Sequence, residues 1–340
     1  ARVATSDPLW FPASTMNIRS ILTVLLLGVS GAAELTHAQT EVNGLQRTLQ
    51  AAPLKAGALH ERWIVKDLPT DEEVRTWTKL PQGLHEFLFI WPNPYGTNLK
   101  RALEIARVHP AQVMIEQYPA PGTASDWRAL AQAGVKLVLW NLRFPTQSER
   151  DLIDSFGFKE VIYARNSYPG KEESVLLRGM KTPVTLTFTT GKLPQYENIE
   201  GLSAIPGNSP LLFVSREWPL GFHRDTLNLI EREKRLRVMG YYPSKEHWRE
   251  LDQIEQIVEI QIAAPPPVEG KTMWERFGDM PLTWTIDNVP GAAALQAYAA
   301  SHADPKKRAL VLDQDFPLRQ EDRELIQTQG LPSLWIHSAQ

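Results

Sequence analysis

A spacing of about 25 residues runs through this 340-residue chain and limits its fold more than any other feature. Twelve short runs of apolar, β-branched or aromatic residues recur between residues 63 and 336, and such runs are typical of buried strands. From residue 63 to residue 334 there are 271 residues in 11 steps. The runs lie at 63–65, 87–90, 113–115, 137–140, 161–163, 184–186, 211–214, 237–239, 258–260, 282–284, 310–312 and 334–336.

Signals for helix starts and helix ends alternate with these runs. A proline followed by a polar or acidic first turn opens several of the intervening segments, as at 69–74 and 317–321. A glycine then precedes the next apolar run, where helices commonly end. Gly83, Gly134, Gly157 and Gly330 occupy such positions. Each repeat therefore predicts one strand and one short helix.

Alternating strands and helices predict a parallel sheet, because a return in the same direction needs a crossover connection. Twelve units of about 25 residues exceed the eight longer units of the common closed barrel. Open solenoids accept any number of units, and their repeats of this kind span about 20–29 residues. We therefore expect an α/β repeat domain over residues 60–340 that forms an open solenoid, or horseshoe. The alternative is a (β/α) barrel with extra strands.

Two stretches carry a resemblance to a known family: LAQAGVKLVLWN at 130–141 and LIDSFGFKEVIY at 152–163. In its period and element order, the chain over residues 60–340 resembles leucine-rich-repeat proteins. Asn93, Asn141 and Asn166 follow strands, at the place of that family's buried asparagine. The resemblance implies a binding or scaffolding protein whose concave sheet face contacts a partner.

The alternation within each strand predicts which residues reach an exposed sheet face. Aromatic and hydrogen-bonding side chains are mixed on that face, which suits a protein, peptide or glycan partner. The candidate binding residues are Trp140, Tyr163, Arg165, Thr187, Tyr241, Gln261, Thr285, Trp335 and His337. A register shift of one residue would exchange the two faces.

The alternative function is that of a carbohydrate-active hydrolase. Carboxylates follow several strands, and α/β barrels place their chemistry at the carboxyl ends of the strands. Two carboxylates about 5–9 Å apart can hydrolyse a glycoside. The candidates are Glu116, Glu217, Asp287 and Asp313.

Other functional classes find no support in the residues. The chain has no cysteine and carries a formal charge of −3, so we expect neither a thiolate metal site nor a nucleic-acid partner. The histidines stand at no metal-binding spacing, and no dinucleotide, phosphate-loop or nucleophile-elbow motif is present. We expect no metal and no cofactor.

The amino-terminal region predicts export. A short segment with one basic residue, Arg19, precedes the apolar run 21–29, and Thr36 and Ala38 supply small residues for signal peptidase. The apolar run is shorter than the ~20 residues needed to cross a bilayer. We expect a signal peptide at 16–38 that is cleaved near Ala38, so that the mature chain has no transmembrane segment and reaches the periplasm or the extracellular space.

The remaining domain boundaries follow from this assignment. Residues 1–15 are expected to be a non-native upstream extension, and residues 39–59 an amino-terminal cap for the repeats. The sequence thus favours an exported binding or scaffolding protein over an enzyme, placed in the bacterial envelope, and leaves open whether it has catalytic activity. A carbohydrate-active hydrolase and a purely structural envelope protein are the alternatives, and the oligomeric state stays open.

Overall fold

The computed structural model describes residues 54–263 and 271–339. The predicted leader and upstream extension, and most of the predicted cap, lie outside these residues. The first strand begins at Leu59, close to the expected start of the repeats.

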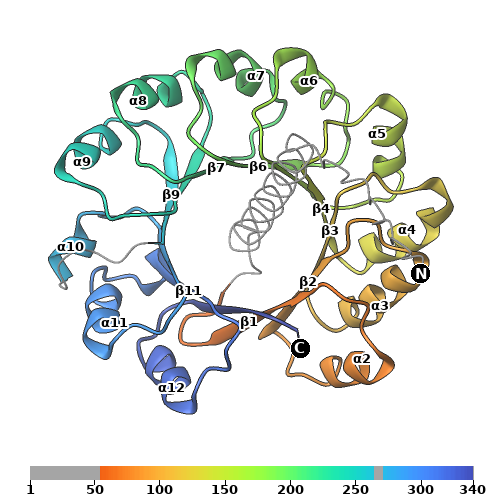
Figure 1. Ribbon diagram of the computed structural model, residues 1–340, viewed down its shortest axis with the longest axis horizontal. Coiled ribbons are helices and arrows are strands. Elements are labelled where there is room, and N and C mark those ends of the chain that lie inside the picture. Colours follow the sequence, from red (N-terminus) through yellow and green to blue (C-terminus); the bar gives the residue numbers. More distant parts are fainter. Residues whose placement is uncertain (1–53, 264–270, 340) are drawn as a thin grey trace, which may run out of the picture. The chain divides into compact units, whose positions relative to one another are not determined.

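Strands and helices alternate along the described chain, as the repeat predicts (Figure 1). The strands are β1 (Leu59–Val65), β2 (His85–Ile90), β3 (Ala111–Ile115), β4 (Lys136–Trp140), β5 (Val161–Arg165), β6 (Val184–Gly191), β7 (Leu211–Ser215), β8 (Lys234–Val238), β9 (Ile257–Ile262), β10 (Leu282–Ile286), β11 (Arg308–Asp313) and β12 (Ser333–Ser338). The α-helices are α2 (Asp71–Trp77), α3 (Gly96–Ala106), α4 (Ala124–Gln132), α5 (Gln147–Asp154), α6 (Lys171–Val175), α7 (Ile199–Ala204), α8 (Gly221–Asn228), α9 (Lys245–Leu251), α10 (Lys271–Glu275), α11 (Ala292–Ala299) and α12 (Gln320–Thr328). Each predicted strand run overlaps an observed strand.

The sheet is a closed barrel, and the expectation of an open solenoid of the leucine-rich-repeat kind is wrong. Each strand pairs in parallel with the strands before and after it, and β1 pairs in parallel with β12 from Leu59–Ser333 to Ile64–Ser338. A horseshoe would leave these two strands as unpaired edges. The fold therefore matches the alternative, a barrel with extra strands, because a barrel is not restricted to eight strands.

The local signals that the sequence carries are confirmed. Thr70 and Thr146 are the N-caps of α2 and α5, and each forms a reciprocal capping box with the glutamate three residues later. Gly83, Gly134, Gly157 and Gly330 have φ angles of 71–83°, in the left-handed region that glycine adopts most readily.

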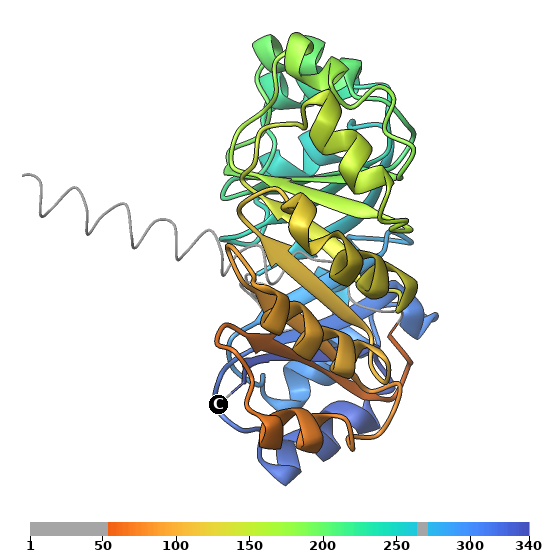
Figure 2. The ribbon, with the colours of Figure 1, turned by 90° about the vertical axis from the view of Figure 1, so that its right-hand side faces the viewer.

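The helices cover the outer face of the barrel (Figures 1 and 2). Alternate residues of each strand, such as Phe87, Phe89 and Leu139, pack with helix residues in one continuous apolar core. The other residues of each strand point to the inner face, and many of them are also buried apolar groups. Examples are Ile64, Leu88, Met114, Val138, Ile162, Val214, Val311, Leu334 and Ile336.

In the part of the chain that the structure describes, no helix is both long enough and apolar enough to cross a membrane.

Candidate functional site

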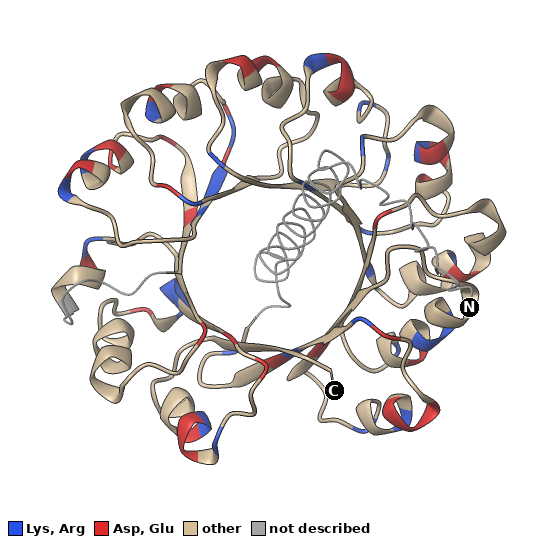
Figure 3. Ribbon diagram, viewed as in Figure 1, with Lys and Arg blue, Asp and Glu red and all other residues tan. Residues whose placement is uncertain are grey.

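Most of the candidate catalytic and binding residues lie at or near the carboxyl-terminal end of the barrel. All the strands are parallel, so every β-to-α connection lies at this end. Glu116 follows β3, Glu217 follows β7, Asp287 follows β10, and Asp313 ends β11. The four predicted carboxylates therefore share one rim of the barrel. Figure 3 shows basic and acidic residues distributed around the whole ring.

Asp287 and Asp313 are neighbours on that rim. Ile286 of β10 is paired with Leu312 of β11, and the two aspartates are the residues that come next on each strand path. Leu312 packs in the outer core, so Asp313 points to the inner face by alternation. Since neighbouring strands lie about 4.8 Å apart, the two aspartates are adjacent positions on the rim. Asp287 is exposed, and its Oδ1 accepts a hydrogen bond from Asn288 Nδ2 at 3.2 Å, whereas Asp313 is half-buried.

Glu116 and Glu217 are separated from this pair. Four strand spacings lie between Glu116 on β3 and Asp313 on β11, which is roughly 19 Å along the sheet. Glu217 on β7 stands three strands from Asp287. The Glu116 side chain is exposed, yet desolvation by the surrounding protein raises the pKa of its carboxyl. Neither residue can form a catalytic pair with the two aspartates.

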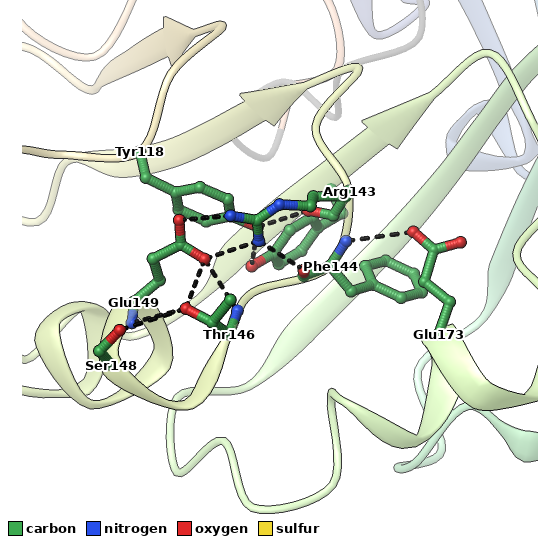
Figure 4. Close-up of polar contacts among 8 residues, drawn as sticks. Tyr118, Arg143, Phe144, Thr146, Ser148, Glu149 and Glu173 are labelled. Atoms are coloured by element: carbon green, nitrogen blue, oxygen red, sulfur yellow. Dashed lines mark hydrogen bonds and ion pairs between the residues drawn. The ribbon is translucent and has the colours of Figure 1, made fainter.

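A second polar cluster lies at the ends of β3, β4 and β5 (Figure 4). Arg143 contacts Glu149 with both terminal nitrogens, at 2.7 and 2.8 Å. The Tyr118 hydroxyl donates to the backbone oxygen of Arg143 at 2.5 Å and lies 3.4 Å from the Tyr163 hydroxyl. Burial raises the pKa of both tyrosines. The arginine and glutamate charges compensate each other, so this cluster orders the loops and presents no activated nucleophile.

Glu149 and Glu173 connect this cluster to the helices behind it. Burial alone would raise the pKa of Glu149, but hydrogen bonds from Arg143 and Thr146 outweigh it and lower the pKa. Glu173 of α6 accepts hydrogen bonds from the Phe144 backbone and from Arg165 Nη1, the latter at 2.6 Å. Arg165, predicted as a binding residue, is thus engaged in holding α6 and the loop after β4.

The structure divides the predicted binding residues between the two faces of the sheet. A closed barrel has no exposed concave face of the horseshoe kind, so these residues cannot lie together on one. Trp140, Thr187, Gln261 and Thr285 point inward, while Tyr163, Arg165, Trp335 and His337 point toward the helices. Tyr241 lies in the loop after β8 and is 52% exposed.

The inner face carries two charge-compensated groups near the amino-terminal ends of the strands. Lys136 Nζ lies 2.9 Å from Glu160, which also accepts a hydrogen bond from Thr185. Arg235 Nε lies 3.6 Å from Glu259, whose Oε1 accepts from Gln261 and Thr283. Each carboxylate is paired with a cation from the neighbouring unit, an arrangement that compensates partly buried charge.

The sequence reasoning missed a buried charged cluster where β1 meets β12. Glu61 accepts a hydrogen bond from Arg323 of α12 at 2.8 Å. His85 on β2 and His337 on β12 lie 3.5 and 3.9 Å from the other carboxylate oxygen. Burial alone would raise the pKa of Glu61, but its contacts with His337, His85 and Arg323 lower it strongly. The adjacent charges Glu61 and Arg62, which directly precede the first apolar run and lie within β1, were the available signal.

Aromatic rings enclose this cluster, which we call the seam cluster and define as Glu61, His85, Arg323 and His337. The His337 ring stacks on Trp335 at 3.9 Å between centroids and meets Trp63 edge-on at 4.4 Å. Arg62, on the opposite face of β1, forms an ion pair with Glu86 of β2. Charged contacts therefore lie on both faces of β1, and a structural role accounts for them.

Among the residues that the structure describes, no group of three or more histidines and carboxylates could hold a metal ion. Carboxyl groups such as those of the exposed Asp287 and the half-buried Asp313 can transfer protons or attack as nucleophiles.

Comparison with known proteins does not assign the chain to a family. No protein-family model and no curated protein matches the chain. Among solved structures, the chain is similar to the catalytic domain of a beta-amylase from Paenibacillus polymyxa, with 9% sequence identity and a TM-score of 0.29. The match covers 83% of this chain and 92% of that one. At so low a TM-score, this likeness carries no information about the function of the chain.

Proposed function

We propose that this protein is a carbohydrate-active hydrolase that acts at the carboxyl-terminal rim of the barrel, with Asp287 and Asp313 as its carboxylate pair. The observation that supports the proposal is their position at the ends of paired neighbouring strands. The ~4.8 Å spacing of neighbouring strands is compatible with the ~5–5.5 Å separation of the acid and the nucleophile in retaining glycoside hydrolases.

The proposed reaction needs one protonated and one ionised carboxyl group. One aspartate protonates the glycosidic oxygen as the carbon–oxygen bond breaks, and the other attacks the anomeric carbon to form a glycosyl-enzyme ester. Water, deprotonated by the first group, then releases the sugar and regenerates both side chains. A different pair, such as Glu116 with Asp313, is too widely separated for either step.

Substitution of the pair tests this proposal. Asp287→Asn and Asp313→Asn should each lower kcat for release of reducing sugar from neutral polysaccharides by about 10²–10⁴-fold, because each variant loses one proton-transfer or nucleophilic group. With an activated aryl glycoside as the substrate, azide should restore turnover in the variant that has lost the nucleophile.

Asp315→Asn is the matched control, since Asp315 is an exposed carboxylate on the same rim that accepts a hydrogen bond from the Ser338 backbone. This variant should keep wild-type turnover. Wild-type turnover in both Asp287→Asn and Asp313→Asn would eliminate the proposed pair.

We also propose that the protein is exported and meets its glycan outside the cytoplasm. The n-region, apolar run and small residues before position 39 support this. Intact-mass analysis of protein recovered from the bacterial periplasm or medium should find a chain that begins at Gln39, and Ala38→Arg should block cleavage. A recovered wild-type chain that retains residues 16–38 would contradict the proposal.

A further inference from the structure

Large aromatic side chains are exposed at one end of the barrel. Among the described residues, all the exposed phenylalanines and tyrosines lie in β-to-α connections or first helical turns, at the carboxyl-terminal end. They are Tyr95, Tyr196, Phe222, Tyr241 and Phe316, with exposures of 74%, 77%, 53%, 52% and 81%. Aromatic residues elsewhere in the described chain are buried or half-buried in the cores. The distribution thus marks one surface.

Three of these side chains come from consecutive units. Tyr196 follows β6, Phe222 follows β7 and Tyr241 follows β8, so the connections that carry them are neighbours around the rim. We call these three residues the aromatic arc. The arc is on the same end of the barrel as Asp287 and Asp313, with β9 between β8 and β10.

Hydrogen bonds between neighbouring loops fix the arc. Gln195, next to Tyr196, lies 3.2 Å from His223 Nε2, next to Phe222. Trp218, in the loop after β7, donates its indole N–H to the backbone oxygen of Tyr241 at 2.7 Å. The three loops are therefore tied to one another while their aromatic rings remain exposed, which lowers the entropy lost when a ligand binds.

The charges of these loops select the class of ligand. Lys192 and Arg216 are matched by Glu197 and Glu217, and the loop 239–244 has no charged residue. A polyanion such as a nucleic acid would need an excess of basic residues. Rings that offer an apolar face, two of them with a hydroxyl, suit a neutral ligand that has both apolar faces and hydroxyl groups.

We propose that the aromatic arc binds an extended chain of a neutral polysaccharide and leads it toward the Asp287–Asp313 pair. This inference rests on the proposed function for its substrate class. It adds that the protein holds a polymer across several sugar units, at a surface distinct from the carboxylates.

Affinity electrophoresis tests the inference. Native gels would contain hydroxyethyl cellulose, amylose, laminarin or glucomannan, and at least one should retard the full chain. Tyr196→Ala and Tyr241→Ala should each weaken the apparent affinity by about 3–10-fold, the effect expected for losing one aromatic platform.

Leu229→Ala is the matched control, because Leu229 is 51% exposed at the end of α8, on the opposite end of the barrel. It should migrate as the wild type does. Thermal melts of all variants should coincide, since the substituted side chains are exposed.

The outcomes separate this inference from the proposed function. Suppose that retardation depends on the arc but Asp287→Asn and Asp313→Asn keep full activity. The proposed catalytic pair would then be wrong, whereas the polysaccharide-binding surface would be supported. Retardation that is unchanged in both tyrosine variants would overturn the aromatic arc alone. An absence of retardation by all four polymers, or sedimentation with neutral phosphatidylcholine vesicles instead, would also overturn it.

Discussion

Glu61 is a charged residue at a buried position of β1. A carboxylate inside an apolar strand run is costly to bury unless it is paired, and here one arginine and two histidines surround it. The seam cluster therefore converts an unfavourable residue into a specific contact between β1, β2, β12 and α12. The sequence shows the charge but not its partners, because Arg323 and His337 are more than 250 residues away.

Glu61→Gln should destabilise the fold by about 2–4 kcal/mol, because it leaves Arg323 and the histidines without their charged partner. Urea unfolding followed by tryptophan fluorescence measures this. The control is Asp322→Asn, which breaks an ion pair with the exposed Arg319 and should cost less than about 1 kcal/mol. Equal effects of the two substitutions would show that the seam cluster has no special contribution.

The same residue predicts a pH dependence. The folded pKa of Glu61 is lowered, so its contribution is fully present above the ordinary carboxyl value of 4.5 and is lost as the pH falls below it. Urea unfolding at three or four pH values between pH 6 and pH 3 measures this dependence. The free energy of unfolding of the wild type should fall more over this range than that of Glu61→Gln does. If the free energies of unfolding of the two proteins fell equally with pH, the lowered pKa of Glu61 would be contradicted.

At the scale of elements, the sequence predicts the repeated parts well and their faces less well. Strand runs, N-caps such as Thr70, and glycine helix ends such as Gly134 depend on local backbone chemistry, which a short window contains. Which face a strand residue takes depends on register, and a change of one position exchanges the faces. Tyr163 and His337 were assigned to the open face in this way, whereas both point toward the helices.

The contact between α6 and α7 depends on one glycine. A Cβ at Gly201 would lie 1.8 Å from the backbone oxygen of Pro169, so the loop before α6 and helix α7 could not keep their present approach. Gly201→Ala should destabilise the protein by about 2–4 kcal/mol, as other overpacked sites do. Gly122→Ala, where a Cβ meets no atom within 4 Å, is the control and should change the melting temperature little. If Gly201→Ala were as stable as the wild type, helix α7 and the loop before α6 would be able to move apart at little cost.

At the scale of the whole barrel, the number of units was predictable and their closure was not. The 25-residue period is a property of each unit, while closure depends on the small angle between successive strands summed over twelve of them. The same limit applies to the candidate site. Asp287 and Asp313 were both identified as strand-end carboxylates, but only the pairing of β10 with β11 makes them neighbours.

Removal of β12 should abolish the soluble fold. A chain that ends at Gly330 leaves β1 and β11 as unpaired edges and lacks His337, so it should aggregate when it is expressed. Size-exclusion chromatography of the soluble fraction measures the loss, with removal of Gln340 alone as the control. A monodisperse monomer from the truncated chain would show that the barrel does not need its last strand.

The pairing of the first strand with the last also governs how the protein is made. Every other strand meets its partner one repeat later, but β1 waits for a segment that is synthesised more than 250 residues afterwards. At about 5–20 residues per second, a ribosome needs roughly 15–60 s to reach it. Throughout that time the growing sheet offers two edges to any neighbouring chain. In the completed protein these edges are paired with each other, so the risk of aggregation through them exists only while the chain is being synthesised.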